Sequence, residues 1–280
     1  MSKGQHRFDE PVQSTAGGIR GFLAHEIYGY RRYWKGTVIV STVTPLLYLL
    51  SLGLGLGSLV DSRGGGDQLG TSYLSYIAPA LLAATGMQIG ATESTFPVMA
   101  GFMWDRAYFA MHATPLTPRQ ILRGSMTWVA IRVAMAATVF YLIVAAFGAA
   151  LTWQSVFSIP LATFGAVAFA APIFAIAAIA QKDNIFNYIF RFIVTPMMLF
   201  AGTFYDISAL PRFGQVIAWI TPLWHTNELV RAVSLGPLDL DTGIGQLSPA
   251  MWAVHLGYLA IWLVGGYVVA ARAFQRRLAT

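Results

Sequence analysis

The amino-acid sequence contains no cysteine and few charged side chains. Without thiols the chain forms no disulfide, offers no thiolate to a metal ion and has no cysteine nucleophile. Charged residues make up 11% of the 280 positions, whereas soluble domains carry roughly a quarter. Hydrophobic residues make up 56%. This composition indicates a membrane protein whose main solvent is lipid rather than water.

The sequence also lacks the short motifs that mark common catalytic sites. It has no G-x-x-x-x-G-K-[ST] phosphate loop, no H-E-x-x-H zinc pair and no G-x-S-x-G nucleophile elbow. No histidine pairs with another at metal-ligand spacing on one helix; the five are His6, His25, His112, His225 and His255. We therefore expect no catalytic residue, metal site or cofactor in this chain, which is not an enzyme by itself.

Long apolar runs predict an all-α polytopic membrane protein with six transmembrane helices. The predicted spans are about 38–60, 73–92, 126–151, 156–180, 185–203 and 250–271. The fifth contains Arg191 and Pro196, so we expect a kink near the proline. A shorter apolar stretch at 213–224 is broken by Pro222 and predicts a re-entrant or interfacial helix on the outer side, before the last span.

The distribution of lysine and arginine predicts the orientation of these spans. The formal net charge is +6, and most cations fall in segments that lie inside if both termini are cytoplasmic. These cations are Arg31, Arg32, Lys35, Arg106, Arg119, Arg123, Lys182, Arg272, Arg276 and Arg277. We expect them to orient the helices and to meet anionic lipid headgroups, and we expect no nucleic-acid partner.

This topology divides the chain into three parts. Residues 1–36 form a cytoplasmic tail and an interface helix, 37–272 form the transmembrane domain, and 273–280 form a second cytoplasmic tail. Residues 1–15 are polar and lack the apolar core of a secretory signal, so we expect the first span to act as an uncleaved insertion signal.

An amphipathic helix is predicted at 17–35. Apolar and aromatic residues recur there every three or four positions, with charged residues between them: Arg20, Glu26, Arg31 and Arg32. Its basic and aromatic character favours a position in the headgroup plane. The alternative is an ordinary charged lead-in to the first span.

The inner segment at 97–124 predicts a second amphipathic helix, which carries Trp104, Asp105, Arg106 and Tyr108. A helix held between two spans is a suitable lever for a cytosolic partner to move. The alternative is a connector lying in the headgroups. Thr117-Pro118 then predicts the start of the next helix.

Two further groups of charged residues stand out. Glu93 and Arg132 lie near the inner ends of spans, where mutual pairing explains them better than a proton relay. Near the outer side, His225, Glu228 and Arg231 follow one another at three-residue spacing, on a helix that Thr226 or Asn227 would cap. That cluster predicts either an outer gate for a substrate or a folding clamp.

Several of these segments carry a resemblance to a known family. They are PLLYLLSLGLGLG in the first span, YIAPALLAATGM and ATESTF in the second, ATPLTPRQILRG after the inner helix, and FAGTFYDISALP and TPLWHTNELVRA before the last span. In this order and spacing the chain resembles ABC-2 (type-2 ABC exporter) permeases. The likeness is greatest to the branch of nodulation-type lipo-oligosaccharide export permeases and daunorubicin-type drug-resistance permeases.

The resemblance implies an architecture of six spans with an interface helix, a cytoplasmic coupling helix and re-entrant outer helices. It implies a homodimer of permeases in a bacterial plasma membrane, served by two copies of a separate ATPase subunit that binds ATP and Mg. The coupling residues would be Trp104, Asp105, Arg106 and Tyr108. An amphipathic substrate, such as a lipid-linked oligosaccharide, glycolipid or hydrophobic drug, would pass apolar side chains including Tyr48, Met87, Met197, Met198 and Phe204.

Two other functions stay open on the sequence. A secondary transporter would need no ATPase and calls for ionisable residues near the middle of several spans. A membrane-embedded enzyme that modifies lipids or glycans calls for several acids that converge at one membrane face.

Overall fold

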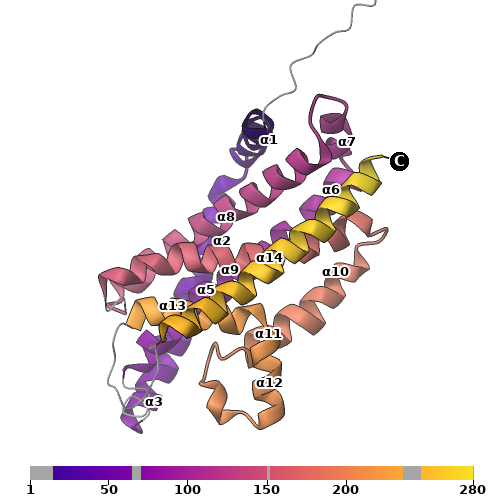
Figure 1. Cartoon of the computed structure of the whole chain (residues 1–280). Helices are drawn as coiled ribbons and strands as arrows, with labels where there is room; N and C mark the ends of the chain where they lie inside the picture. Colours follow the sequence, from indigo (N-terminus) through magenta and orange to yellow (C-terminus); the bar gives the residue numbers. More distant parts are fainter. Residues whose placement is uncertain (1–14, 65–70, 150–151, 236–246, 280) are drawn as a thin grey trace, which may run out of the picture.

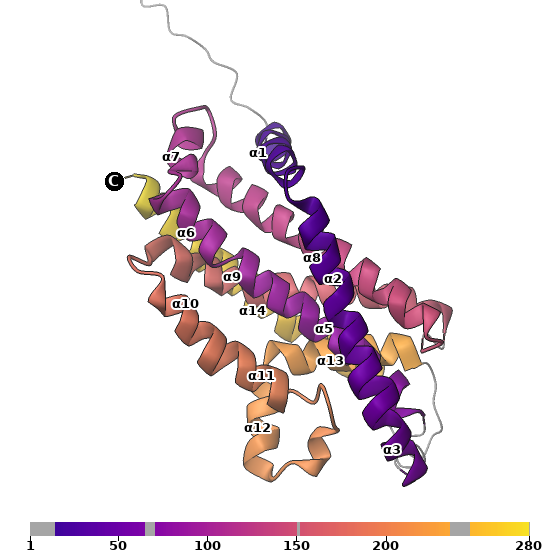
Figure 2. The same cartoon turned by 180° about the vertical axis from the view of Figure 1, so that it is seen from behind.

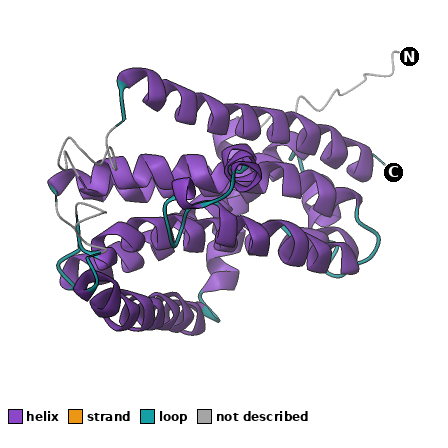
Figure 3. Cartoon of the chain, turned by 90° about the horizontal axis from the view of Figure 1, so that it is seen from below, coloured by secondary structure: helices purple, strands orange, loops and turns teal. Residues whose placement is uncertain are grey.

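A computed structural model describes residues 15–64, 71–149, 152–235 and 247–279, and over these ranges all regular structure is helical (Figures 1 and 3). Short 3-10 and π-helical segments (η) interrupt or extend the α-helices. In chain order the elements are α1 (Thr15–Tyr30), α2 (Trp34–Tyr48), η1 (Leu49–Leu56), α3 (Gly57–Ser62), α5 (Tyr73–Glu93), α6 (Phe96–Met103), α7 (Ala107–His112), α8 (Pro118–Ala146), η2 (Trp153–Phe157), α9 (Ser158–Ile179), α10 (Asn184–Ile189), η3 (Phe190–Val194), α11 (Thr195–Phe200), η4 (Ile207–Ala209), α12 (Arg212–Ile220), α13 (Pro222–Leu235) and α14 (Pro249–Leu278).

Among the described residues, four helical segments are long and apolar enough to cross a membrane. They are Tyr73–Met103, Pro118–Ala146, Trp153–Ile179 and Pro249–Leu278. Each contains or overlaps one of the predicted spans. The prediction of an all-helical membrane protein is therefore confirmed.

The first and fifth predicted spans are less regular than the other four. Their apolar helices, Leu46–Ser62 and Asn184–Phe200, are each 17 residues long, and each includes a π-helical stretch, η1 or η3. In the fifth, η3 ends two residues before Pro196, which lies in the first turn of α11. Proline removes a backbone donor and crowds the preceding turn, and a wider π-turn at that point is one way for a helix to accommodate it.

The third predicted span begins earlier than its hydropathy suggests. The helix α8 starts at Pro118 because Thr117 caps it: the Thr117 hydroxyl accepts from the Gln120 amide, and the Gln120 side chain accepts from the Thr117 amide at 2.8 Å. This reciprocal capping box fixes the start of the helix. The start that the Thr117-Pro118 pattern predicts is confirmed.

The helix α9 forms the centre of the bundle, and α5, α8, α13 and α14 all pack against it. Its buried face consists largely of alanine, including Ala162, Ala166 and Ala170, each fully buried. Small residues let helix backbones approach closely, which is a common basis of helix packing in membranes. The contact with α14 is especially tight, since a Cβ on Gly266 would lie 2.6 Å from the backbone nitrogen of Pro172.

Different helices lie at the two ends of the bundle. One end carries α1, α7 and the C-terminal end of α14, and the other carries α3 and α12 (Figure 1). Figures 1 and 2 both show α1 nearly along its axis, and Figure 2 shows α2 running down the bundle across α8 and α5. The helix α1 therefore lies across the end of the bundle; its position in the headgroup plane stays a prediction.

Candidate functional site

The turn between α6 and α7 holds three of the four residues predicted to couple the chain to a partner. Trp104, Asp105 and Arg106 are exposed, Trp104 at 58%. The single helix predicted through Trp104 and Tyr108 is wrong, because the chain turns at Arg106. Arg106 adopts a φ of 51°, in the left-handed region that costs a residue with a Cβ roughly 1–2 kcal/mol. Backbone strain of this kind tends to gather at functional turns.

Tyr108 differs from its three neighbours because its side chain points into the protein. It is only 6% exposed, and its hydroxyl lies 3.2 Å from the Ser125 hydroxyl of α8. Its ring contacts Phe102, Phe274 and Phe22, with centroids 4.9, 5.7 and 6.4 Å apart. Burial raises the pKa of Tyr108, so the phenol stays a neutral hydrogen-bonding group. Tyr108 thus anchors the exposed turn to α1, α6, α8 and α14 rather than contacting a partner.

The interface helix α1 is held to this end of the bundle by Phe22. That ring is 2% exposed and lies over Gly124 of α8, where a Cβ would come within 2.5 Å of it. The cationic residues predicted here, Arg20, Arg31 and Arg32, are exposed. Arg31 and Arg32 lie in the turn between α1 and α2 rather than in a helix.

Glu26 of α1 lines a cavity of about 250 Å³ beneath the exposed turn. The cavity also touches the side chains of Glu93, Asp105 and Tyr108. Burial raises the pKa of Glu26, and the nearby Glu93 charge adds to this effect while His25 opposes it. Glu26 therefore faces the protein interior, unlike the arginines of the same segment.

Glu93 and Arg132 are hydrogen bonded to each other. The Nε and Nη2 atoms of Arg132 lie 3.0 and 2.9 Å from Oε1 of Glu93. The Arg132 guanidinium also lies over the ring of Tyr30, 4.6 Å from its centroid. The pair connects the C-terminal end of α5 to α8 and to the last residue of α1, and its charges are mutually compensated.

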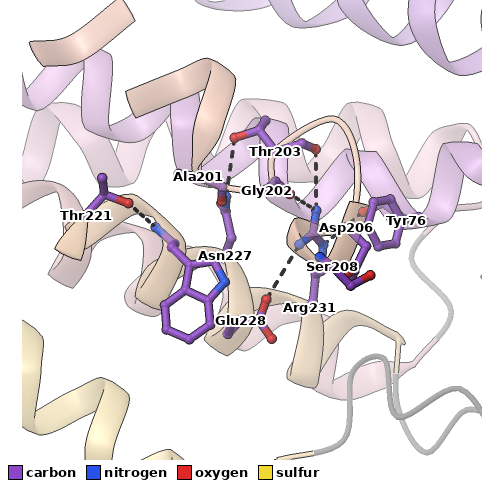
Figure 4. Close-up of polar contacts among 11 residues, drawn as sticks. Tyr76, Ala201, Gly202, Thr203, Asp206, Ser208, Thr221, Asn227, Glu228 and Arg231 are labelled. Carbon is purple, nitrogen blue, oxygen red and sulfur yellow. Dashed lines mark hydrogen bonds and ion pairs between the residues drawn. The ribbon is translucent and has the colours of Figure 1, made fainter. Parts of the chain in front are cut away.

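The polar network at the other end centres on Arg231 of α13 (Figure 4). Arg231 is 3% exposed. Its Nε donates to the Tyr76 carbonyl at 3.4 Å, and its Nη2 donates to the Gly202 and Thr203 carbonyls. The guanidinium stacks on the Tyr76 ring at 4.0 Å and lies 3.8 Å from Glu228. One buried cation therefore ties α13 to α5 and to the turn after α11.

The helix that carries this cation begins earlier than predicted. Thr226 and Asn227 are not caps, because α13 starts at Pro222 and the Thr221 hydroxyl accepts from the Trp224 amide. Asn227 is instead fully buried and donates to the Ala201 carbonyl at 2.9 Å. It is a second tie from α13 to the turn after α11, which the pattern of charged residues did not indicate.

His225 does not belong to the Glu228–Arg231 cluster, so the predicted three-residue group is wrong in this respect. Its Nδ1 lies 2.8 Å from Nδ1 of His255 in α14, and its Nε2 lies 2.9 Å from the Trp219 carbonyl. The ring stacks on Tyr258, with centroids 3.9 Å apart. Sequence reasoning missed this histidine pair because its members lie 30 residues apart on two helices.

The residues predicted to line a substrate path lie on several elements. Met87 of α5 and Met197 of α11 are 1% and 4% exposed, so both are part of the core in this conformation. Tyr48, Met198 and Phe204 are half-buried and pack against that core.

Comparison with known proteins relates this arrangement to a transporter family. The profile of the family described as "ABC-2 type transporter" matches residues 19–235. A nodulation protein J of Rhizobium leguminosarum bv. viciae is 28% identical over 249 residues, which cover 88% of this chain and 90% of that protein. A nodulation protein J of Sinorhizobium fredii is 29% identical over 250 residues, covering 88% and 89%.

A more distant relative has a descriptive name. The inner membrane transport permease YadH of Escherichia coli K12 is 24% identical over 272 residues, which cover 92% of this chain and 94% of that protein. The family profile covers more than half of the chain and includes both the exposed turn and the Arg231 network. The chain therefore belongs to the ABC-2 type transporter family and is an integral membrane protein, the membrane subunit of an ABC transporter.

Proposed function

We propose that this chain is the permease of an ATP-driven exporter, and that a separate ATPase subunit drives it through the turn at Trp104, Asp105 and Arg106. The observation that supports the proposal most strongly is the combination of exposed side chains and a strained backbone in this turn. Its side chains are exposed and its backbone is strained at Arg106, while the next helix is anchored by the buried Tyr108. A partner that pushes on the turn would move α6, α7 and their packed neighbours as one body.

The proposed topology has six spans and two cytoplasmic termini, in a bacterial plasma membrane. The four long helices supply four crossings, and the helices through Leu46–Ser62 and Asn184–Phe200 supply two more. The position of α1, α7 and the end of α14 at one end of the bundle supports this arrangement (Figure 1). Arg106, Arg276 and Arg277 then lie on the cytoplasmic side, in keeping with the positive-inside rule.

The proposed assembly is a homodimer of permeases with two ATPase subunits, which bind ATP and Mg. An exposed apolar face on the Asn184–Phe200 helix supports a second copy: Tyr188, Phe192 and Ile193 are 62%, 65% and 50% exposed. ATP-driven closure of the ATPase subunits would move the inner turns and change how the two permeases meet in the bilayer.

The proposed substrate is amphipathic: a lipid-linked oligosaccharide, a glycolipid or a hydrophobic drug. It would leave along the contact between the two permeases. Tyr48, Met198 and Phe204 would contact its apolar part, and Met87 and Met197 would be uncovered only when the helices separate. The pairing of Glu93 with Arg132 supports this view over a proton-driven transporter, since neither charge is left to carry protons.

The decisive experiment uses the chain purified in nanodiscs together with a candidate ABC ATPase subunit. We expect the Asp105→Ala/Arg106→Ala double variant to stay folded and to lose substrate-stimulated ATP hydrolysis. The matched control is Arg20→Ala/Arg31→Ala, which removes two exposed charges of the interface segment and should leave hydrolysis largely intact. Full, substrate-stimulated activity of a stable complex with the double variant at 105 and 106 would refute the assignment of the turn.

A further inference from the structure

The histidine pair between α13 and α14 has defined protonation states. A carbonyl can only accept a hydrogen bond, so Nε2 of His225, 2.9 Å from the Trp219 carbonyl, carries a proton. In the neutral ring Nδ1 of His225 is then an acceptor. The 2.8 Å contact requires that Nδ1 of His255 be the donor. Neutral His255 therefore keeps its free lone pair on Nε2.

That lone pair is buried and has no partner. His255 is 0% exposed, and among the described residues nothing donates to its Nε2. The ring of Trp224 lies against it, with centroids 5.1 Å apart. A first proton can bind at this Nε2, which creates a buried imidazolium whose new N–H meets no acceptor. A second proton can bind only at Nδ1 of His225, where two N–H groups would then face each other and the hydrogen bond would be lost.

The other ionisable groups around the pair do not compensate this charge. The helix α9 and the segment η2, which pack on α13, contain none. Tyr258 of α14 donates to the Ile220 carbonyl. The remaining ionisable groups on α13, on α14 and on the elements packed against them either engage other partners or lie at distant ends of their helices: Glu228, Arg231, Tyr73, Tyr76, Glu93, Tyr108, His112, Arg119, Arg123, Arg132, Tyr141, Arg212, Tyr267, Arg272, Arg276 and Arg277.

We propose that His225 and His255 form a proton-binding latch, which fastens α12 and α13 to the last span when neutral and releases them when protonated. Burial lowers the pKa of His225, so the closed arrangement favours the neutral ring and loses stability as the pH falls. That the latch senses the outer compartment rests on the orientation given under the proposed function. The latch itself does not depend on that orientation or on an ATPase.

Hydrogen exchange on the full chain in nanodiscs tests the latch directly. After correction for intrinsic exchange, we expect amides of residues 212–235 to exchange about tenfold faster near pH 5 than near pH 7.5. Amides of the central helix α9 should not change. His255→Gln should abolish the acid response, because a glutamine amide hydrogen-bonds to His225 in either protonation state. His255→Phe cannot form the bond and should exchange fast at both pH values.

Two controls separate the latch from other acid effects. His25→Gln removes an exposed histidine of α1, and Glu228→Gln removes the carboxylate three residues along α13; both should keep the wild-type acid response. Protection that is independent of pH in the wild type, or an equal acid response in His255→Gln, would overturn the latch. Because no readout uses ATP, that outcome would leave the proposed export function standing.

Discussion

The two ends of this molecule are fastened by different kinds of contact. At the end with α7, Tyr108 is enclosed by the rings of Phe22, Phe102 and Phe274 and makes one hydrogen bond. At the end with α13, Arg231 bonds to three backbone carbonyls. Dense aromatic packing resists deformation and moves as a unit. A hydrogen-bond network depends on geometry and can be exchanged for water once it opens. The end with α7 is thus built to transmit movement, and the end with α13 is built to hold or release.

The largest expected effect is at the end with α7, with Tyr108→Ala. Removing a buried ring from this cluster should cost about 4 kcal/mol of stability, as aromatic-to-alanine changes in cores commonly do. Thermal unfolding in detergent measures it. The control Tyr108→Phe keeps the ring and loses only the bond to Ser125, so its cost should be about 1 kcal/mol. Equal losses for both variants would mean that the hydroxyl, and not the packing, holds this end.

The next largest effect is at the end with α13, with Arg231→Met. Methionine fills the volume but leaves the carbonyls of Tyr76, Gly202 and Thr203 without their donor, at about 3 kcal/mol in total. Proteolysis of the turn after α11 should speed up, while the end with α7 stays protected. Arg231→Lys keeps a cation without the planar fork and should be intermediate. If lysine proved equivalent to arginine, charge alone would account for the network.

A smaller effect is expected between the two ends, at Gly266 of α14. This residue lies between His255 and Phe274, and the Cβ of Gly266→Ala would meet the backbone of Pro172 at 2.6 Å. Forcing α14 away from α9 should cost about 2 kcal/mol. Gly257→Ala, with nothing within 4 Å of its Cβ, is the matched control. We expect a clear fall in melting temperature for the first variant only; a harmless Gly266→Ala would show that the two helices have room to separate.

The smallest expected effect concerns Glu93 and Arg132. Glu93→Gln keeps one acceptor for the guanidinium and loses its countercharge, so we expect a loss of about 1 kcal/mol. A double-mutant cycle with Arg132→Gln should show coupling of similar size. A coupling energy near zero would show that this ion pair does not help to hold α5 against α8.

Hydropathy and helix signals in the sequence predicted much of this architecture. The apolar runs located the four long helices, and Thr117-Pro118 located the start of α8, since both signals are local. The break at Arg106 was missed because apolar residues keep a helical period through a turn of left-handed backbone. The His225–His255 contact depends on how α13 packs on α14, and no spacing along the chain encodes it.

The predicted outer cluster failed in an informative way. His225, Glu228 and Arg231 do share one helix, but positions three residues apart shift steadily around its surface. The first and last of the three, His225 and Arg231, therefore face different neighbours. Arg231 reaches α5 and the turn after α11, while His225 reaches α14. Sequence spacing found residues that matter and could not say which of them touch.

The length of the last helix has a mechanical consequence. Its 30 residues measure about 45 Å at 1.5 Å per residue, against a hydrocarbon layer of about 30 Å. A rod of this length must tilt or protrude, and its tilt changes with bilayer thickness. His255 lies near one end of this helix and Phe274 near the other. A change in acyl-chain length would therefore strain the contacts of His255 with His225 and of Phe274 with Tyr108 at the same time.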